Sequence, residues 1–144
     1  MLVFDTNILV YAASERSGYY EASRRALEQA RADPSPAYLT WSVCYEFLRT
    51  STHPRVLHAP LTAEQAREFL DALLVGAGFG LLVATDRHMD VLARTIEEFP
   101  DTRANGMHDL HTVVLMREHG ISRICTLDSG FRRFPFLTVV DPSE

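Results

Sequence analysis

Short apolar runs alternate along the whole chain with longer segments in which apolar residues recur at helical spacing. The predicted strands are Leu2–Phe4, Ala37–Trp41, Leu81–Val83, Ile124–Thr126 and Leu137–Val140. The predicted helices are Ile8–Ala13, Tyr20–Arg31, Val43–Thr50 with Ser42 as N-cap, Thr62 to about Val75, Arg87–Phe99 and His108–His119. Strands that alternate with helices form a parallel sheet with helices on both faces. We therefore expect an α/β fold, a three-layer sandwich around a central parallel sheet of about five strands.

The length of the chain predicts a single domain. Its 144 residues suit one compact core and no linker or internal repeat divides them, so we expect one domain over residues 1–144. The first residues lack the basic and apolar regions of a signal peptide. The longest uncharged stretch, 72–85, is interrupted by three glycines and falls short of the ~20 apolar residues of a membrane span. These features predict a cytoplasmic protein without a membrane segment.

Arginine supplies all 14 basic side chains, and the chain contains no lysine. This excludes P-loop nucleotide binding and Schiff-base chemistry, which both need a lysine amine. The net charge of −5 argues against a protein that coats polyanions, so any bound nucleic acid must be held at a local patch or through metal ions. Cys44 and Cys125 stand apart among apolar neighbours, which predicts buried thiols and neither a disulfide framework nor a zinc site.

Acidic residues follow the predicted strands closely, and the carboxyl ends of parallel strands are where ligands bind in open α/β sheets. Asp5, Asp86 and Asp128 each end a strand, while Glu46 and Asp109 lie near the starts of helices. Asp5 also fits a helix cap, Asp109 a helix-dipole role and Asp128 a turn. Glu46 stands out because apolar residues surround it, so its carboxylate would be desolvated unless a cation compensates. The residues alone indicate a weak carboxylate cluster with an unknown partner.

Four motifs in chain order resemble those of the PIN-domain family. They are Asp5-Thr6-Asn7 after the first strand, Glu46, His108-Asp109-Leu110, and Thr126-Leu127-Asp128-Ser129-Gly130-Phe131. The chain is more closely similar to the VapC toxins of bacterial toxin–antitoxin pairs, through Thr52-His53-Pro54-Arg55-Val56, Pro60-Leu61-Thr62 and Phe131-Arg132-Arg133-Phe134-Pro135. The resemblance covers essentially the whole chain and implies a PIN-like fold.

This resemblance implies a metal-dependent endoribonuclease that acts as the toxin of a toxin–antitoxin pair. The catalytic acids would be Asp5, Glu46, Asp109 and Asp128, and the metal ligands among them Asp5, Asp109 and Asp128. Carboxylate oxygens suit Mg²⁺ or Mn²⁺, and such a cation activates water for attack on a phosphodiester. The resemblance further implies an RNA substrate, a small cognate antitoxin and a homodimer.

The chain departs from the family pattern at Gly130, where many relatives carry a further acid. Fewer ligands predict one tightly bound cation in the free protein, with a second arriving only with substrate. Asp86 matches no family position, and we interpret Asp86 and Arg87 as a strand-end cap and surface pair.

Several side chains near the acids allow both a functional and a structural interpretation. Thr6 and Asn7 can orient a carboxylate or a metal-bound water, with helix capping by Thr6 as the alternative, and Thr126 stands in a similar position before Asp128. The histidines of the last helix are expected to face away from Asp109 or to serve in packing, namely His108, His111 and His119. Trp41 is expected in the core, although its ring would also suit stacking on an unpaired base.

Arginine is the predicted phosphate-binding residue, because its guanidinium grips phosphate with two hydrogen bonds. The candidates are Arg16, Arg49, Arg55, Arg87, Arg132 and Arg133. Arg132 and Arg133 follow Asp128 closely and are the favoured substrate-binding pair. Arg49 lies three residues after Glu46 on the same side of a helix, and it either neutralises this acid or binds RNA.

The candidate surfaces for partner proteins are the Tyr19-Tyr20 pair, the alanine-rich helix after it and the apolar stripe of the helix from Thr62. Core packing explains each of them equally well.

Two other functions stay open at this point. The first is a phosphohydrolase with Asp5 as covalent nucleophile, although Asn7 stands where such enzymes carry a second acid and their usual lysine is absent. The second is a non-catalytic module whose acids hold a structural cation or a basic partner.

Overall fold

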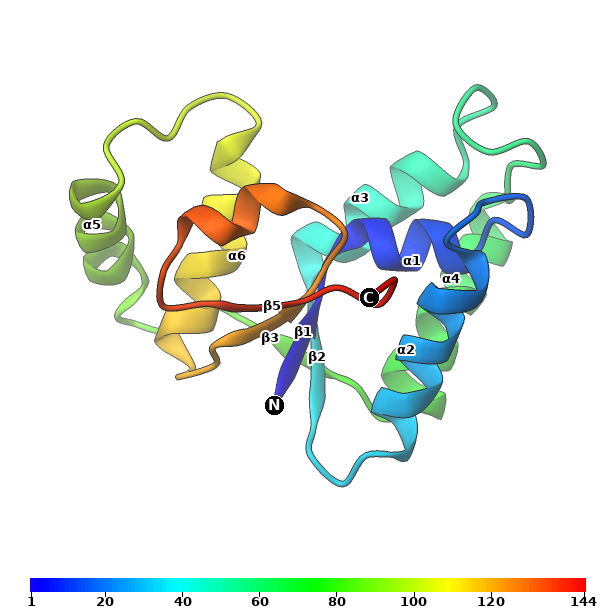
Figure 1. The fold of residues 1–144 in the computed structure, drawn as a ribbon, viewed down its shortest axis with the longest axis horizontal. Helices are drawn as coiled ribbons and strands as arrows, with labels where there is room; N and C mark the ends of the chain where they lie inside the picture. The colour runs from blue at the N-terminus through cyan, green and yellow to red at the C-terminus, as the bar shows by residue number, and fades with distance from the viewer.

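The computed structural model describes residues 1–144 and contains one five-stranded sheet with helices on both sides (Figure 1). The strands are β1 (Leu2–Phe4), β2 (Ala37–Thr40), β3 (Gly80–Leu82), β4 (Arg123–Cys125) and β5 (Thr138–Val140). All neighbours pair in parallel, in the order β3-β2-β1-β4-β5. The expected three-layer α/β sandwich is therefore confirmed. Because β1 and β4 are neighbours at the centre, the residues that follow them meet at one edge of the sheet.

The helices are α1 (Thr6–Ala12), α2 (Tyr20–Ala32), α3 (Trp41–Ser51), α4 (Ala63–Asp71), α5 (His88–Glu98) and α6 (Gly106–Glu118). A π-helical turn, Ala72–Gly76, extends α4, and a 3-10 turn, Ser129–Arg133, follows β4. When the π-helical turn is counted with α4, every predicted helix and strand is present with its ends within two residues of the prediction. None of these helices is long and apolar enough to cross a membrane.

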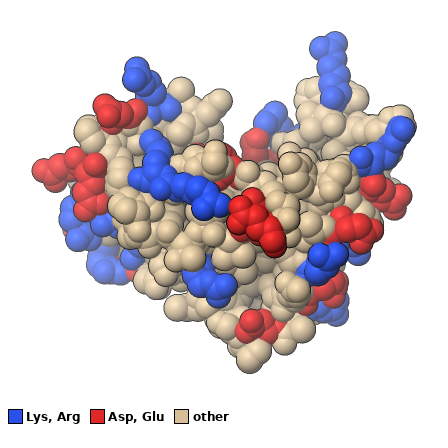
Figure 2. Space-filling model, viewed as in Figure 1, with Lys and Arg blue, Asp and Glu red and all other residues tan.

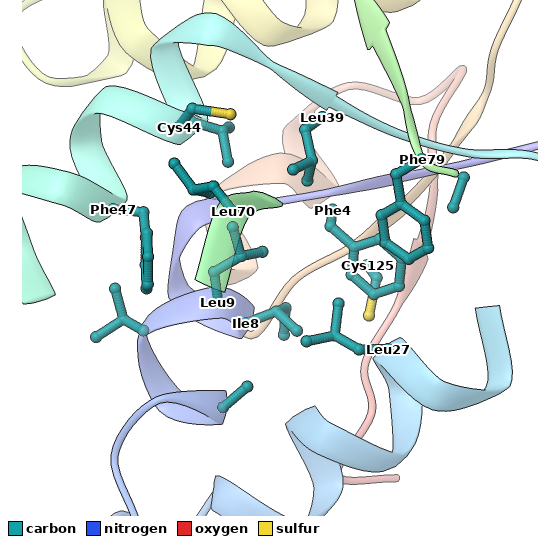
Figure 3. Close-up of a cluster of buried hydrophobic side chains, with 14 of the residues drawn as sticks. Phe4, Ile8, Leu9, Leu27, Leu39, Cys44, Phe47, Leu70, Phe79 and Cys125 are labelled. Carbon is teal, nitrogen blue, oxygen red and sulfur yellow. The ribbon is translucent and has the colours of Figure 1, made fainter. Parts of the chain in front are cut away.

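Two apolar clusters form the core, one on each face of the sheet, because successive strand residues point to opposite sides. Figure 3 shows the first cluster, in which the ring of Phe4 stacks on Phe79 with ring centroids 5.7 Å apart and helices α1 to α4 add their apolar side chains. Val3 and Ile124 belong to the second cluster, beneath α5 and α6. The helices on each face are thus held by burial against the sheet.

The two cysteines lie in the first cluster as free thiols, as predicted. Burial raises the pKa of Cys44 to about 11 and that of Cys125 to about 12. Both side chains are therefore protonated and unreactive at neutral pH.

At the carboxyl edge of the sheet, α5 and α6 rise on one side and α1 to α4 on the other (Figure 1). Figure 2 shows the surface hollowed between these two groups of helices, with arginines and acids interspersed over the same face. The residues that follow the central strands β1 and β4 therefore face this hollow.

Two predictions at the start of α3 are wrong. Thr40 is the N-cap in place of Ser42, because its hydroxyl accepts a hydrogen bond from the Val43 N–H at 3.1 Å. Trp41 is 52% exposed and does not lie in the core. The physical reason is shared: β2 ends one residue earlier than predicted, so Trp41 begins the helix and its side chain turns outward.

Candidate active site

Asp5 directly follows β1 and is the N-cap of α1. Its Oδ1 accepts a hydrogen bond from the Thr6 N–H at 2.8 Å, and its Oδ2 accepts one from the Thr126 hydroxyl at 2.7 Å. Burial raises the pKa of Asp5; the hydrogen bonds from Thr126 and Thr6 oppose this rise, and the charge of Asp128 adds to it. The cap and the site acid are therefore the same residue, and Thr6 is not the cap.

Asn7 and Thr126 link the loops after β1 and β4. The Asn7 amide donates to Asp5 Oδ2 at 3.3 Å and to the Thr126 hydroxyl oxygen at 3.2 Å, and its Oδ1 accepts from the Leu127 N–H at 3.3 Å. The same Thr126 oxygen accepts from the Asp128 N–H at 2.9 Å. Of the two interpretations for Asn7, the structure supports orientation of a carboxylate.

Asp109 approaches the same edge from the first turn of α6. Its pKa is raised to about 6, mainly by burial and then by the negative charges of Asp5 and Asp128. The positive charge of Arg133 acts in the opposite direction. Asp5, Asp109 and Asp128, which are far apart in the chain, therefore lie within one electrostatic neighbourhood.

Glu46 lies on the exposed side of α3. Arg49 donates to its Oε2 from Nε at 3.2 Å and to its Oε1 from Nη2 at 2.5 Å. This hydrogen bond is the main reason that the pKa of Glu46 is lowered, and His108 adds a smaller electrostatic effect. The expected desolvation of Glu46 is wrong, because Val43 and Phe47 turn inward while the carboxylate stays in solvent.

The arginines near the acids differ in what they contact. Arg133 packs over the ring of Phe134, 4.5 Å from its centroid, and acts on the charge of Asp109. Arg132 turns the other way, toward Glu144 at 3.9 Å. Of the two favoured substrate-binding arginines, Arg133 is the one beside the aspartates.

Asp86 and Arg87 do not form the expected pair. The Arg87 guanidinium donates to the backbone oxygen of Glu118 at 2.6 Å, and the Asp86 side chain is exposed without a partner. Since β3 is the edge strand, two positions from β1, Asp86 lies away from the three aspartates.

The sequence analysis did not predict a polar cluster at the C-terminal end of α6. The Glu118 carboxylate accepts hydrogen bonds from the Thr85 N–H at 2.9 Å and the Thr85 hydroxyl at 2.7 Å, and pairs with His88 Nδ1 at 2.6 Å. His111 lies next to His88 and hydrogen-bonds to Ser42 at 2.9 Å. No local sequence pattern predicts these contacts, because the partners come from separate elements.

No three His, Cys, Asp or Glu side chains are already arranged as a cluster able to hold a metal ion. The chemistry of the three aspartates nevertheless fits a hard divalent cation, since they present only carboxylate oxygens. A cation among Asp5, Asp109 and Asp128 would offset the repulsion that contributes to the raised pKa of Asp109. These residues therefore fit Mg²⁺ or Mn²⁺, and their side chains must approach one another to share one ion.

Comparison with known proteins gives consistent matches over nearly the whole chain. The model of the PIN domain family matches residues 2–137. The chain is 32% identical to ribonuclease VapC48 of Mycobacterium tuberculosis over 139 residues, which cover 96% of this chain and 95% of that relative.

Solved structures share the fold at low sequence identity. A crystal structure of VapBC2 from Rickettsia felis bound to a promoter DNA fragment matches with a TM-score of 0.68 and 17% identity, covering 96% of both chains. Mycobacterium tuberculosis VapC20, a toxin that cleaves the sarcin-ricin loop, matches with a TM-score of 0.66 and 16% identity, covering 92% of this chain and 94% of VapC20.

Proposed function

This chain belongs to the PIN-domain family, and from that premise we propose that it is a metal-dependent endoribonuclease, the toxin of a toxin–antitoxin pair. One observation supports the proposal above others: Asp5, Asp109 and Asp128, from three separate parts of the chain, lie near enough at the carboxyl edge of a parallel sheet to act on one another's charge. Ligand sites of open α/β sheets occur at this edge. The nuclease is proposed to be a single domain over residues 1–144.

In the proposed site, Asp5, Asp109 and Asp128 hold Mg²⁺ or Mn²⁺, and Glu46 is the fourth catalytic acid. A bound cation supplies positive charge at the scissile phosphate and activates water for attack. The hydrogen bonds from Thr126 and Asn7 keep the Asp5 carboxylate in one orientation. Such fixed partners preserve ligand geometry during turnover.

Substrate binding is assigned to Arg133, Arg132 and Arg49. Arg133 lies beside Asp109 and is best placed to grip a phosphate next to the acids. Arg49 has to exchange Glu46 for a phosphate, which costs little because this ion pair is exposed. In this way binding of RNA would release Glu46 for the reaction.

The test is cleavage of labelled RNA with Mg²⁺, with Mn²⁺ and with EDTA. We expect cleavage with either cation, none in EDTA, and none by Asp109→Asn in any buffer. Asp86→Asn is the matched control, since Asp86 lies in the loop after β3, an edge strand two positions from β1, and it should cleave normally. Intact RNA in every lane would overturn the proposal, and release of phosphate from a phosphomonoester instead would favour the phosphohydrolase alternative with Asp5 as nucleophile.

For the antitoxin, we propose the groove between α2 and α4. It has a volume of about 170 Å³ and its apolar lining includes Leu27, Phe69 and Leu73. Of the predicted α4 stripe, Ala66 and Leu70 are buried inside the protein, whereas Phe69 and Leu73 line this groove. The VapBC2 match is a protein solved together with promoter DNA, as expected for a pair whose antitoxin binds its operator.

For the homodimer, we propose the face around the edge strand β3. Trp41 and Val83 follow the paired residues Thr40 and Leu82, so they extend adjacent strands, and both are exposed. Tyr45 packs against Trp41 with centroids 6.5 Å apart and is itself 68% exposed. An apolar rim beside an unpaired strand is a surface that folded proteins usually cover.

A further inference from the structure

A single side-chain hydrogen bond joins the two helices that face each other across the hollow. Ser42 Oγ on α3 lies 2.9 Å from His111 Nδ1 on α6. No other side-chain hydrogen bond connects α3 to α6, and the two helices are not extensively packed against each other. The positive charge of His108 on α6 also acts on Glu46 on α3, but the Ser42–His111 bond is the one side-chain hydrogen bond between the two helices.

Further side chains support His111, the α6 partner in this hydrogen bond. The ring of His88 contacts His111 edge-on, with centroids 5.9 Å apart, and its Nδ1 lies 2.6 Å from Glu118. The Glu118 side chain is fully buried and is held on its other oxygen by two hydrogen bonds from Thr85. A buried carboxylate with all these donors is costly to move. Through His88 and Glu118, His111 is therefore held relative to Thr85, which follows β3, independently of its bond to Ser42.

The Ser42–His111 bond lies close to two of the proposed catalytic acids. Ser42 is four residues before Glu46, one helical turn away on the same side of α3. His111 is two residues after Asp109 on α6. Neither residue reaches the three aspartates through a hydrogen bond of its own. Any effect on the acids must be transmitted through the helices that carry them.

We propose that Ser42 and His111 are positioning residues that set the distance between α3 and α6, and with it the distance between Glu46 and Asp109. This inference rests on the proposed function, because it assigns the two acids to one reaction. Misplacement of a catalytic group by ~1 Å can cost up to ~100-fold in rate. Without this bond, α3 and α6 would sample a wider range of separations.

The kinetic test compares variants that remove or keep the bond. Ser42→Ala should lower kcat about 3- to 30-fold while KM changes less than about 2-fold, because two of the three proposed substrate-binding arginines, Arg132 and Arg133, are not on α3 and the third, Arg49, is on the exposed side of that helix. Ser42→Thr keeps the hydroxyl and should restore kcat. Ser143→Ala is the matched control, since it also removes one exposed serine hydrogen bond, at 2.6 Å to Asp141, and should leave both constants unchanged.

The His111 side of the bond offers a second comparison. The amide of asparagine lies as far from the backbone as histidine Nδ1, so His111→Asn should keep most of kcat. Glutamine places its amide one methylene further out, so His111→Gln should lose activity as Ser42→Ala does. Equal activity of His111→Asn and His111→Gln, or failure of Ser42→Thr to restore kcat, would overturn the positioning role.

A structural readout keeps this test separate from the proposed function. The chain has one tryptophan, Trp41, beside Ser42, and an acceptor dye on Met107→Cys would mark the start of α6. The native thiols do not compete for the dye, because burial raises the pKa of Cys44 to about 11 and that of Cys125 to about 12. Labelled chains are mixed with excess unlabelled Trp41→Phe chains so that energy transfer stays within one copy.

Ser42→Ala should broaden the distribution of Trp41-to-dye distances, and Ser143→Ala should not. An unchanged distribution together with an unchanged kcat would overturn the inference while leaving the ribonuclease proposal intact. A broadened distribution in a protein that cleaves no RNA would uphold the bond between the helices and refute the proposed function.

Discussion

Asp109 carries a charge that the folded protein accommodates poorly. Its pKa is about 6 in the folded protein against an ordinary value of 3.8, so the folded state binds the proton more tightly than the unfolded chain. A carboxyl with a raised pKa stabilises the fold below its ordinary pKa, and this stability is lost as pH rises through about 6.

Asp109→Asn should therefore raise the free energy of unfolding in EDTA at about pH 7.5 by about 1 to 3 kcal/mol. The difference should nearly vanish at about pH 3, where the aspartate is mostly protonated in both states. Urea unfolding at the two pH values measures it, with Asp86→Asn as control. A less stable Asp109→Asn at the higher pH would show that this acid serves the fold.

Thr126 holds three groups of the site together. Its buried hydroxyl donates a hydrogen bond to Asp5 and accepts one each from the Asn7 amide and the Asp128 N–H. Thr126→Val keeps the shape but leaves these groups without their partner. We expect a loss of about 1 to 3 kcal/mol in the free energy of unfolding and a fall of about 10-fold or more in RNA cleavage. Thr126→Ser should recover both. Full activity of Thr126→Val would exclude an orienting role.

At the scale of the elements, the pairing of β2 with β3 depends on a glycine. Tyr38 is the register partner of Gly80, and a Cβ added at Gly80 would lie 2.7 Å from the Tyr38 ring. Gly80→Ala should therefore cost about 1 to 3 kcal/mol. Gly76→Ala is the matched control, since its Cβ would meet nothing within 4 Å and alanine favours helix. Thermal unfolding of the two variants decides the matter, and equal Tm values would contradict the steric argument.

The whole molecule exposes the apolar face around β3, which bears on its oligomeric state. We expect a dimer by light scattering, and Tyr45→Arg should convert it to a monomer because a charge would be buried at the interface. Val75→Arg replaces another exposed apolar side chain, on the extension of α4, and should leave the dimer intact. A dimer that survives Tyr45→Arg would place the interface elsewhere.

Expression of the chain without its antitoxin should slow bacterial growth if the ribonuclease acts as a toxin. Asp5→Asn should remove this effect at equal protein level, since the amide has no net charge to offer a cation. Growth curves with immunoblots provide the measurement. Undiminished toxicity of Asp5→Asn would mean that the toxic effect does not come from this site.

The layout of strands and helices could be predicted from the sequence because short apolar runs and the apolar spacing of helices are local patterns. The meeting of Asp5 and Asp128 also followed, since both come directly after strands of one parallel sheet. Asp109 is a less direct case. Its place in the first turn of a late helix was visible in the chain, while its nearness to the other two depends on how α6 lies on the sheet.

Tertiary structure decided the remaining features, because each depends on where a helix surface faces. Glu46 and Trp41 both lie near apolar neighbours in the chain, yet α3 turns them to solvent. The bond between Ser42 and His111 joins residues 69 positions apart, and no local pattern encodes such a pair. Spacing along the chain fixes which residues share a face of one element, whereas contact between two elements is set by their packing on a common core.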